Sequence, residues 1–301
     1  MGHLGTAVTE LTWGIVAGLT AGFAWTIITL LVRSVTDIVR PVSVTTIRSL
    51  GGGGLILVAA LATGYGPEIM EMPLWAVLAL WASMLIAMGI GDVLFFACIE
   101  HLGITRALTL SLANPLLTLV VGIGLLGEAL TAARALGILL VVGGLALIIM
   151  GKGETTRVTQ ANQRLGLRLV FVAAAAWALS AIIMKSPLQL VSPVAAAVVR
   201  IPIAGVVLCL TPWARGTWDT VVRSPQPVRL RLGAICALSA VVSLLFTASI
   251  KYAGVAIGNV LSSTSPLFAV PFEVFVLKQR PSRETILGTI ISVGGIVLMQ
   301  V

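Results

Sequence analysis

The chain alternates between long apolar runs and short polar stretches that contain Gly, Pro, Arg and Lys. Each run approaches the length of about 20 residues with which an α-helix crosses roughly 30 Å of hydrocarbon. The pattern therefore predicts an all-α membrane protein with ten transmembrane helices. Their approximate ranges are 11–32, 42–62, 74–99, 104–126, 131–150, 165–184, 191–210, 232–250, 255–277 and 285–301.

A polar stretch at residues 151–164 (GKGETTRVTQANQR) separates the first five runs from the last five. We accordingly expect one five-helix repeat in residues 1–150, a polar linker at 151–164, and a second five-helix repeat in residues 165–301. The two halves match at a nearly constant offset. At an offset of 152 residues the matched pairs are Gly14 and Gly166, Trp25 and Trp177, Ser34 and Ser186, Pro41 and Pro193, and Arg48 and Arg200. At 151 residues they are Gly103 and Gly254, Pro115 and Pro266, Gly137 and Gly288, and Gly143–Gly144 and Gly294–Gly295.

This repeat has a topological consequence. Because each half has an odd number of spans, the second half must enter the membrane from the opposite face. Inverted repeats of this kind are typical of transporters that work by alternating access. A duplicated scaffold or a membrane-embedded enzyme is the alternative that the repeat alone leaves open.

Composition agrees with a membrane protein. Hydrophobic residues make up 58% of the chain and charged residues only 10%, whereas about a quarter of a soluble globular protein is charged. The net charge of +8 does not indicate nucleic-acid binding, because the basic residues gather in loops, as they do on the cytoplasmic side of membrane proteins. The lipid bilayer and a small molecule are the expected partners, and the sequence leaves the oligomeric state open.

Motifs for other chemistry are missing from the sequence. It has no Walker loop, zinc motif, G-x-S-x-G sequence or pair of carboxylates, so we expect no cofactor, no metal and no hydrolytic or ATP-driven activity. Cys98, Cys209 and Cys236 lie far apart in apolar runs and fit packing rather than metal binding. A membrane-embedded enzyme acting on a lipid or isoprenoid substrate remains the alternative function. It would need clustered catalytic groups, yet the chain has two histidines, of which His3 is near the N-terminus.

Four charged residues fall within the apolar runs: Arg48, Asp92, Arg200 and Glu273. A charge in hydrocarbon costs at least about 2.5 to 3.5 kcal/mol, so each needs a partner or a wet cavity. Arg48 and Arg200 are repeat mates that either bind an anionic group such as a carboxylate or extend to the nearer interface. Asp92 is too short to extend. It is either a proton site or a partner in a structural pair, with an arginine as one candidate. Glu273 lies nearer a helix end, within reach of water or Lys278.

Prolines and tryptophans mark further positions. Asn114–Pro115 and Ser265–Pro266 are matched polar-proline pairs within the fourth and ninth runs, where a proline removes a helix hydrogen bond. Such breaks serve transporters as binding sites or hinges, and a static kink is the other reading. Trp25 and Trp177 lie nearer midspan than interfacial aromatics do, which fits either a cavity wall or packing.

In this order, repeated twice, these features resemble the EamA family of the drug/metabolite transporter superfamily over nearly the whole chain. They comprise the paired tryptophans and arginines, the helix ends at 97–103 and 248–254, the polar-proline pairs, and Gly127–Glu128 followed by a Gly-Gly helix. The second half departs from the pattern, with Lys278 and Gln279 in place of Gly127 and Glu128.

The resemblance implies a central cavity between the halves and a secondary transporter of small metabolites, amino-acid-like compounds or drugs. We expect Trp25, Arg48, Asn114, Trp177, Arg200 and Ser265 to bind substrate. Asp92 is the candidate for coupling to a proton, and Pro115 and Pro266 are candidate hinges.

The loop charges predict an orientation. The loops after the odd-numbered spans hold 14 Lys and Arg residues, and the other loops hold 3. Basic residues stay in the cytoplasm, so the count places both termini outside a cytoplasmic (inner) membrane. The family resemblance implies the reverse, with both termini inside.

Overall fold

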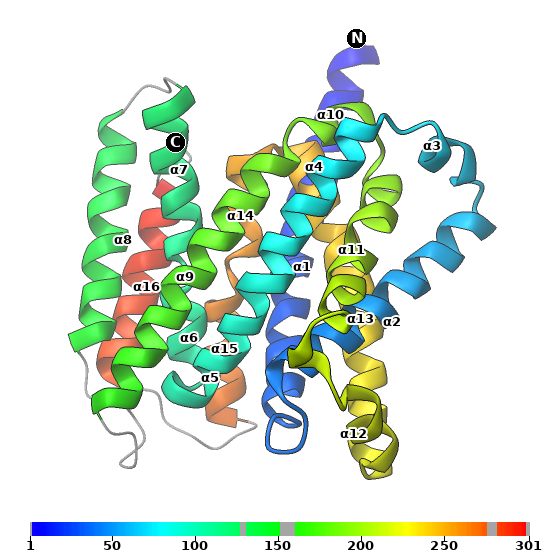
Figure 1. The fold of residues 1–301 in the computed structure, drawn as a ribbon. Helices are drawn as coiled ribbons and strands as arrows, with labels where there is room; N and C mark the ends of the chain where they lie inside the picture. The colour runs from blue at the N-terminus through cyan, green and yellow to red at the C-terminus, as the bar shows by residue number, and fades with distance from the viewer. Residues whose placement is uncertain (1, 127–130, 151–159, 276–281, 299–301) are drawn as a thin grey trace.

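The computed structural model describes residues 2–126, 131–150, 160–275 and 282–298, and the regular elements in this part of the chain are helices. Figure 1 shows them as a bundle of steeply inclined helices. The first half contains α1 (Gly2–Arg33), α2 (Pro41–Ala62), α3 (Gly66–Met70), α4 (Leu74–Met84), a π-helical segment (Leu85–Asp92), α5 (Val93–Leu102), α6 (Ile104–Leu110), α7 (Ala113–Leu126) and α8 (Ala132–Met150). The second contains α9 (Gln160–Met184), α10 (Pro187–Leu190), α11 (Pro193–Cys209), a 3₁₀ turn (Pro212–Ala214), α12 (Thr217–Arg223), α13 (Gln226–Ala253), α14 (Val255–Ser262), α15 (Ser265–Phe275) and α16 (Arg283–Leu298).

Helix length and hydropathy give a lower count of membrane spans than the sequence pattern. Within the described residues, six helical stretches are long and apolar enough to cross a membrane. A seventh is obtained if α11 and α12, which are bent by 83° at their junction, form one span. The all-helical fold is confirmed, while α14, α15 and α16 are shorter than a membrane span requires.

The described residues include only the end of the predicted polar linker. Residues 160–164 form the first turn of α9, and residues 151–159 lie outside the described part of the chain.

The fourth and ninth runs are broken, but the breaks precede the prolines. The chain turns between α6 and α7 at Ser111 and again between α14 and α15 at Ser263. Pro115 and Pro266 then lie in the first turns of α7 and α15. A first-turn N–H has no partner within the helix, so a proline there costs no hydrogen bond. The expectation that these prolines remove an interior hydrogen bond is therefore wrong.

The two halves run in opposite directions and pack against each other. In Figure 1, α1 descends from the top, whereas its repeat mate α9 begins at the bottom. Across the halves, α1 packs on α13, α2 on α11, and α8 on α16. The start of α1 and the end of α16 both lie toward the top.

Close contacts between α8 and α16 follow the repeat. A Cβ atom on Gly144 would lie 2.6 Å from the carbonyl oxygen of Gly288, and one on Gly295 would lie 2.7 Å from that of Gly137. Exchanging the halves converts one contact into the other, because Gly137 matches Gly288 and Gly144 matches Gly295. Glycine permits this backbone approach, which any larger residue would prevent.

The helices α2 and α11 show the same relation. Gly53 lies against Pro202, and Gly205 lies against Leu50, with 2.7 and 2.6 Å from the glycine Cβ positions to the Cγ atoms. Both contacts are again exchanged by the offset of 152 residues. The structure thus has an internal two-fold relation that the repeated sequence encodes.

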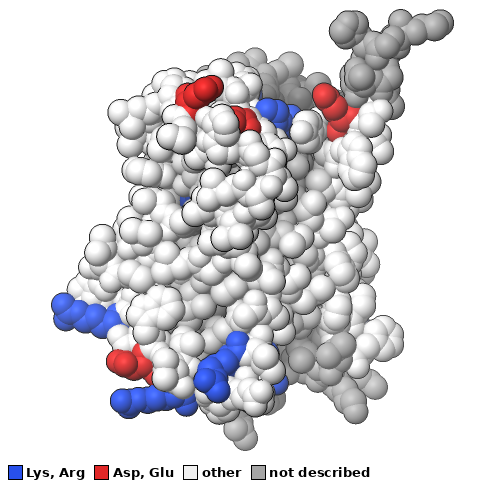
Figure 2. Space-filling view, turned by 90° about the vertical axis from the view of Figure 1, so that its right-hand side faces the viewer, with Lys and Arg blue, Asp and Glu red and all other residues white. Residues whose placement is uncertain are grey.

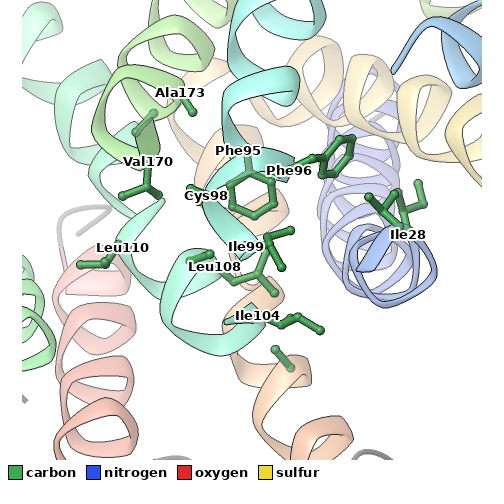
Figure 3. Close-up of a cluster of buried hydrophobic side chains, with 14 of the residues drawn as sticks. Ile28, Phe95, Phe96, Cys98, Ile99, Ile104, Leu108, Leu110, Val170 and Ala173 are labelled. Atoms are coloured by element: carbon green, nitrogen blue, oxygen red, sulfur yellow. The ribbon is translucent and has the colours of Figure 1, made fainter. Parts of the chain in front are cut away.

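An apolar core joins α1, α5, α6 and α9. Its members include Ile28, Phe95, Phe96, Leu108 and Val170, which Figure 3 shows converging from these helices.

Charged residues are distributed in bands on the molecular surface. Figure 2 shows most of the Lys and Arg atoms in view at the lower end, acidic groups mainly at the upper end, and a nearly uncharged band between them. This band is the surface expected of a protein whose middle is surrounded by hydrocarbon.

Candidate functional site

A cavity of about 150 Å³ lies between the two halves. Its walls combine aromatic, hydroxyl, amide and charged side chains from both repeats. The residues that the sequence singled out line it together: Trp25, Arg48, Asp92, Asn114, Trp177, Arg200 and Ser265. The structure therefore brings all six candidate binding residues and the candidate coupling acid to one place. Their roles stay predictions.

Asp92 faces the interior and forms an ion pair with Arg48. The carboxylate oxygen Oδ2 accepts a hydrogen bond from Nη2 of Arg48, and both side chains are about 95% buried. The other oxygen, Oδ1, accepts from the indole Nε1 of Trp177 at 2.8 Å. Arg48 also donates from Nη1 to Ser239 at 3.1 Å. This conformation matches one of the alternatives left open for Asp92, in which the carboxylate is paired with an arginine.

The π-helical segment positions the carboxylate. Asp92 is its last residue, and a wider helical turn of this kind is often found at functional sites. Gly91, next to Asp92, makes room for the indole. A Cβ atom there would lie 2.6 Å from Nε1 of Trp177. The indole also approaches the carbonyl oxygen of Ala87 at 3.2 Å, so it is held against this segment at two points.

Aromatic rings surround the guanidinium of Arg48. Its Cζ atom lies 5.2 Å from the ring centroid of Trp25 and 5.3 Å from that of Phe96, within cation–π distance. Trp25 stacks on Phe96 with centroids 5.8 Å apart, and meets Trp177 edge to face, also at 5.8 Å. The two matched tryptophans are therefore in contact across the halves. Sequence reasoning missed Phe96, although it lies one helical turn after Asp92.

Arg200 has a different environment. Its Nε donates to Ser83 at 2.9 Å and its Nη2 donates to Ser180 at 3.0 Å, and the residue is only 3% exposed. Among the described residues, no carboxylate lies within ion-pair distance of Arg200. Neither arginine extends to the interface, since both are buried and line the cavity. The alternative that they extend to the membrane surface is wrong.

A pair of amides closes another side of the cavity. Asn114 and Asn259 exchange two side-chain hydrogen bonds at 3.1 and 3.2 Å, and Asn259 also donates to Thr118 at 2.9 Å. This contact joins α7 to α14 beside the two helix breaks. Nearby, the carbonyl oxygen of Ser265 accepts from Thr26 at 3.0 Å. Asn259 was not expected from the sequence, because its position in the first half carries no matching amide.

Contacts between the halves also lie at the two ends of the bundle. At the upper end, Glu68 on α3 accepts hydrogen bonds from the backbone N–H and the hydroxyl of Ser192, at 2.5 and 2.8 Å, where α11 begins. At the lower end, Ser43 on α2 contacts Thr217 on α12 at 2.8 Å. The short helices that follow the second long helix of each half thus bind the opposite half at opposite ends.

Gly127, Glu128, Lys278, Gln279 and the side chain of Glu273 lie outside the described residues.

Arg106 is one of the 14 basic residues that the sequence pattern places in the loops after odd-numbered spans, but it lies on α6 and is 7% exposed. Arg106 is therefore a buried residue. It no longer supports the orientation inferred from the excess of basic residues in the loops after odd-numbered spans.

No group of three or more potential metal ligands occurs in the part of the chain that the structure describes.

The comparisons with known proteins agree with this geometry. The model of the EamA-like transporter family matches residues 12–150 and again residues 164–301. The chain belongs to this family. The resemblance found in the sequence is thereby confirmed, and membership makes the chain a multi-pass membrane transporter with two EamA domains.

A solved structure, titled only "Crystal structure of protein", has the same fold. It superposes with a TM-score of 0.69 at 18% sequence identity, over 96% of this chain and 97% of its own. At this identity the likeness concerns the fold alone. Among proteins with curated descriptions, none matches this sequence significantly.

Proposed function

We propose that the chain is a secondary transporter that moves small organic solutes through the central cavity by alternating access. The observation that carries this proposal is the convergence of three matched residue pairs and Asp92 on one cavity in a member of a transporter family. Metabolites, amino-acid-like compounds and drugs are the candidate solutes. A cavity of about 150 Å³ is on the scale that encloses a benzene-sized molecule.

The ten-span topology belongs to this proposal. Within the described residues, each predicted run contains a helix or a broken pair of helices. The glycine contacts between the halves are exchanged by the repeat offset. The broken pair α6–α7 still provides a candidate span, Ile104–Val121, whereas α14 and α15 are each too short to count alone. Both pairs are interrupted beside the cavity, which Ser111 and Ser263 line. Broken helices beside a binding site are a recurring feature of transporters.

We propose that the basic end of the bundle faces the cytoplasm and that both termini lie on the other side of a cytoplasmic (inner) membrane. Arg40 donates to the carbonyl oxygen of Arg215, and Arg231 donates to that of Ser34, so these basic loops meet at one end. The start of α1 lies at the opposite end. Basic loops are retained in the cytoplasm.

The end contacts suggest how access alternates. The Glu68–Ser192 contact holds α3 on α11 at one end, and the Ser43–Thr217 contact holds α12 on α2 at the other. Each contact joins the two halves. Opening one while the other stays closed would expose the cavity to one side at a time, with bending at the breaks before Pro115 and Pro266.

The proposal includes Asp92 as the site of proton coupling. In this conformation the carboxylate is engaged by Arg48 and by the indole of Trp177. A coupling role therefore requires the Arg48–Asp92 pair to separate at another stage of the cycle, when Asp92 could take up a proton.

The alternative, a membrane enzyme acting on a lipid or isoprenoid, is favoured by no specific observation. The carboxylate among the cavity-lining residues is committed to an ion pair, and family membership indicates transport.

A flux measurement in proteoliposomes tests the proposed function. The purified protein is reconstituted, and uptake and efflux of a panel of labelled small solutes are followed with and without a pH gradient. We expect saturable flux of at least one solute class, reduced at least tenfold by Asn114→Ala and unchanged by Asn162→Ala, whose side chain is exposed. Flux equal to that of protein-free liposomes for every solute would contradict the proposal.

A further inference from the structure

The two halves of the cavity differ in charge. In the first half, Arg48 is balanced by Asp92. The position that matches Asp92 in the second half, at an offset of 151 residues, is Ser243. Ser243 also lines the cavity, from α13. The arginine is therefore repeated in the second half and the carboxylate is not.

Among the described side chains, the guanidinium of Arg200 consequently has only hydroxyl groups as hydrogen-bond partners. Its two hydrogen bonds go to Ser83 and Ser180, and its Nη1 amino group makes no hydrogen bond with any described residue. A guanidinium has five N–H donors in a planar fork that matches a carboxylate. With 97% of the residue buried, the charge lies in a region of low dielectric where an opposite charge is strongly favoured.

The charged groups lining the cavity are Arg48, Asp92 and Arg200, which sum to one positive charge. An ammonium group on a ligand would find no uncommitted carboxylate among these residues, because Asp92 already binds Arg48 and Trp177. The remaining lining side chains are aromatic, aliphatic, or neutral hydroxyls and amides. This distribution favours a ligand with one negative charge over a neutral, zwitterionic or cationic ligand of the same size.

We propose that the cavity binds a small organic monocarboxylate, and that the ligand's carboxylate takes the place at Arg200 that Asp92 takes at Arg48. This inference rests on the proposed transport function and names its substrate class. The body of the ligand then lies against the aromatic wall that Trp25 and Trp177 contribute. Its size is bounded by the cavity of about 150 Å³.

Binding to the full-length protein in lipid nanodiscs tests the inference. The probes are butanoate, hexanoate and benzoate, each paired with its primary amide, which is nearly isosteric and uncharged. Affinity is measured by isothermal titration calorimetry. We expect at least one acid to bind at least tenfold more tightly than its amide. This preference should vanish in Arg200→Gln and persist in Arg229→Gln, where an exposed arginine on α13 is removed.

A second pair of variants leaves Arg200 in place. Ser243→Asp supplies the missing carboxylate to the second half and should weaken binding of the acid at least tenfold. Ser243→Asn introduces a side chain of nearly the same size as aspartate but without its charge, and this variant should retain binding of the acid. Equal binding of acid and amide, an unchanged preference in Arg200→Gln, equal effects of the two Ser243 variants, or no binding of any acid would overturn the inference.

The flux assay separates this inference from the proposed function. If amides or amines cross the membrane through the protein while the acids do not, the carboxylate site is wrong and the transport function stands. If the acids bind in an Arg200-dependent manner but no solute crosses, the site stands and the transport function is wrong.

Discussion

The buried ion pair between Arg48 and Asp92 gives the sharpest prediction about stability. Removing either charge leaves the other buried without its partner, which costs about 3 to 5 kcal/mol. Asp92→Asn keeps an oxygen that can accept from Trp177, so its cost comes mainly from the unpaired guanidinium. Arg48→Gln also loses two cation–π contacts, each worth about 0.5 to 2 kcal/mol.

The double variant Arg48→Gln/Asp92→Asn removes both charges together. Replacing a buried pair by neutral groups of similar shape is often close to neutral. We therefore expect the double variant to be more stable than either single variant, with a coupling free energy of about 3 kcal/mol. The free energy of unfolding is measured by circular dichroism during SDS titration in mixed micelles.

The Arg33–Asp37 pair is a matched control. It joins the same two residue types at 3.3 Å, but its side chains are 43% and 84% exposed. A surface pair of this kind is worth about 0 to 1 kcal/mol, so Arg33→Gln and Asp37→Asn should show little coupling. Additive losses in the Arg48 and Asp92 variants would refute the claim that this buried pair is a coupled unit.

Three further predictions concern topology, packing and coupling. Alkaline phosphatase fused after Val301 should be active if the basic end faces the cytoplasm, and fluorescence from a cytoplasm-only fluorescent protein at that end would reject this orientation. Gly91→Ala should displace Trp177 and reduce flux at least tenfold. Gly89→Ala is the control, because a Cβ atom there would meet nothing within 4 Å, and it should leave flux unchanged. Similar flux in the two variants would contradict a functional role for the close contact between Gly91 and Trp177. Asp92→Asn should abolish flux driven by a pH gradient and preserve exchange of solute across the membrane, and an unchanged gradient dependence in the folded variant would exclude Asp92 as the proton site.

Much of this site could be predicted from the sequence because lipid constrains where polar groups lie. A charge within an apolar run needs a partner or a wet cavity, and Asp92 is too short to extend to the interface. The repeat identifies Arg200 as the position related to Arg48. Glycines that the sequence repeats at a constant offset lie at helix contacts in the structure, as between Gly144 and Gly288. These inferences need only the cost of burial and the periodicity of the chain.

Pairing between side chains could not be predicted in the same way. Asp92 could equally have met Arg48 or Arg200, since helix packing decides which guanidinium is nearer. The hydrogen bond from Trp177 to Asp92 and the amide pair of Asn114 with Asn259 join opposite halves, 85 and 145 residues apart. The helix breaks also fell earlier than expected, because Pro115 starts a helix rather than interrupting one.

The central claim is that one cavity opens alternately to the two sides of the membrane. Ser180→Cys, in a chain without native cysteines, places a thiol in the cavity for a membrane-impermeant maleimide. We expect labelling in vesicles of both orientations. Cross-linking cysteines at Glu68 and Ser192 should abolish labelling from the upper end alone, and cross-linking Ser43 to Thr217 should abolish it from the lower end alone. Labelling from one side only in the uncross-linked protein, or labelling from both sides that neither cross-link alters, would contradict alternating access.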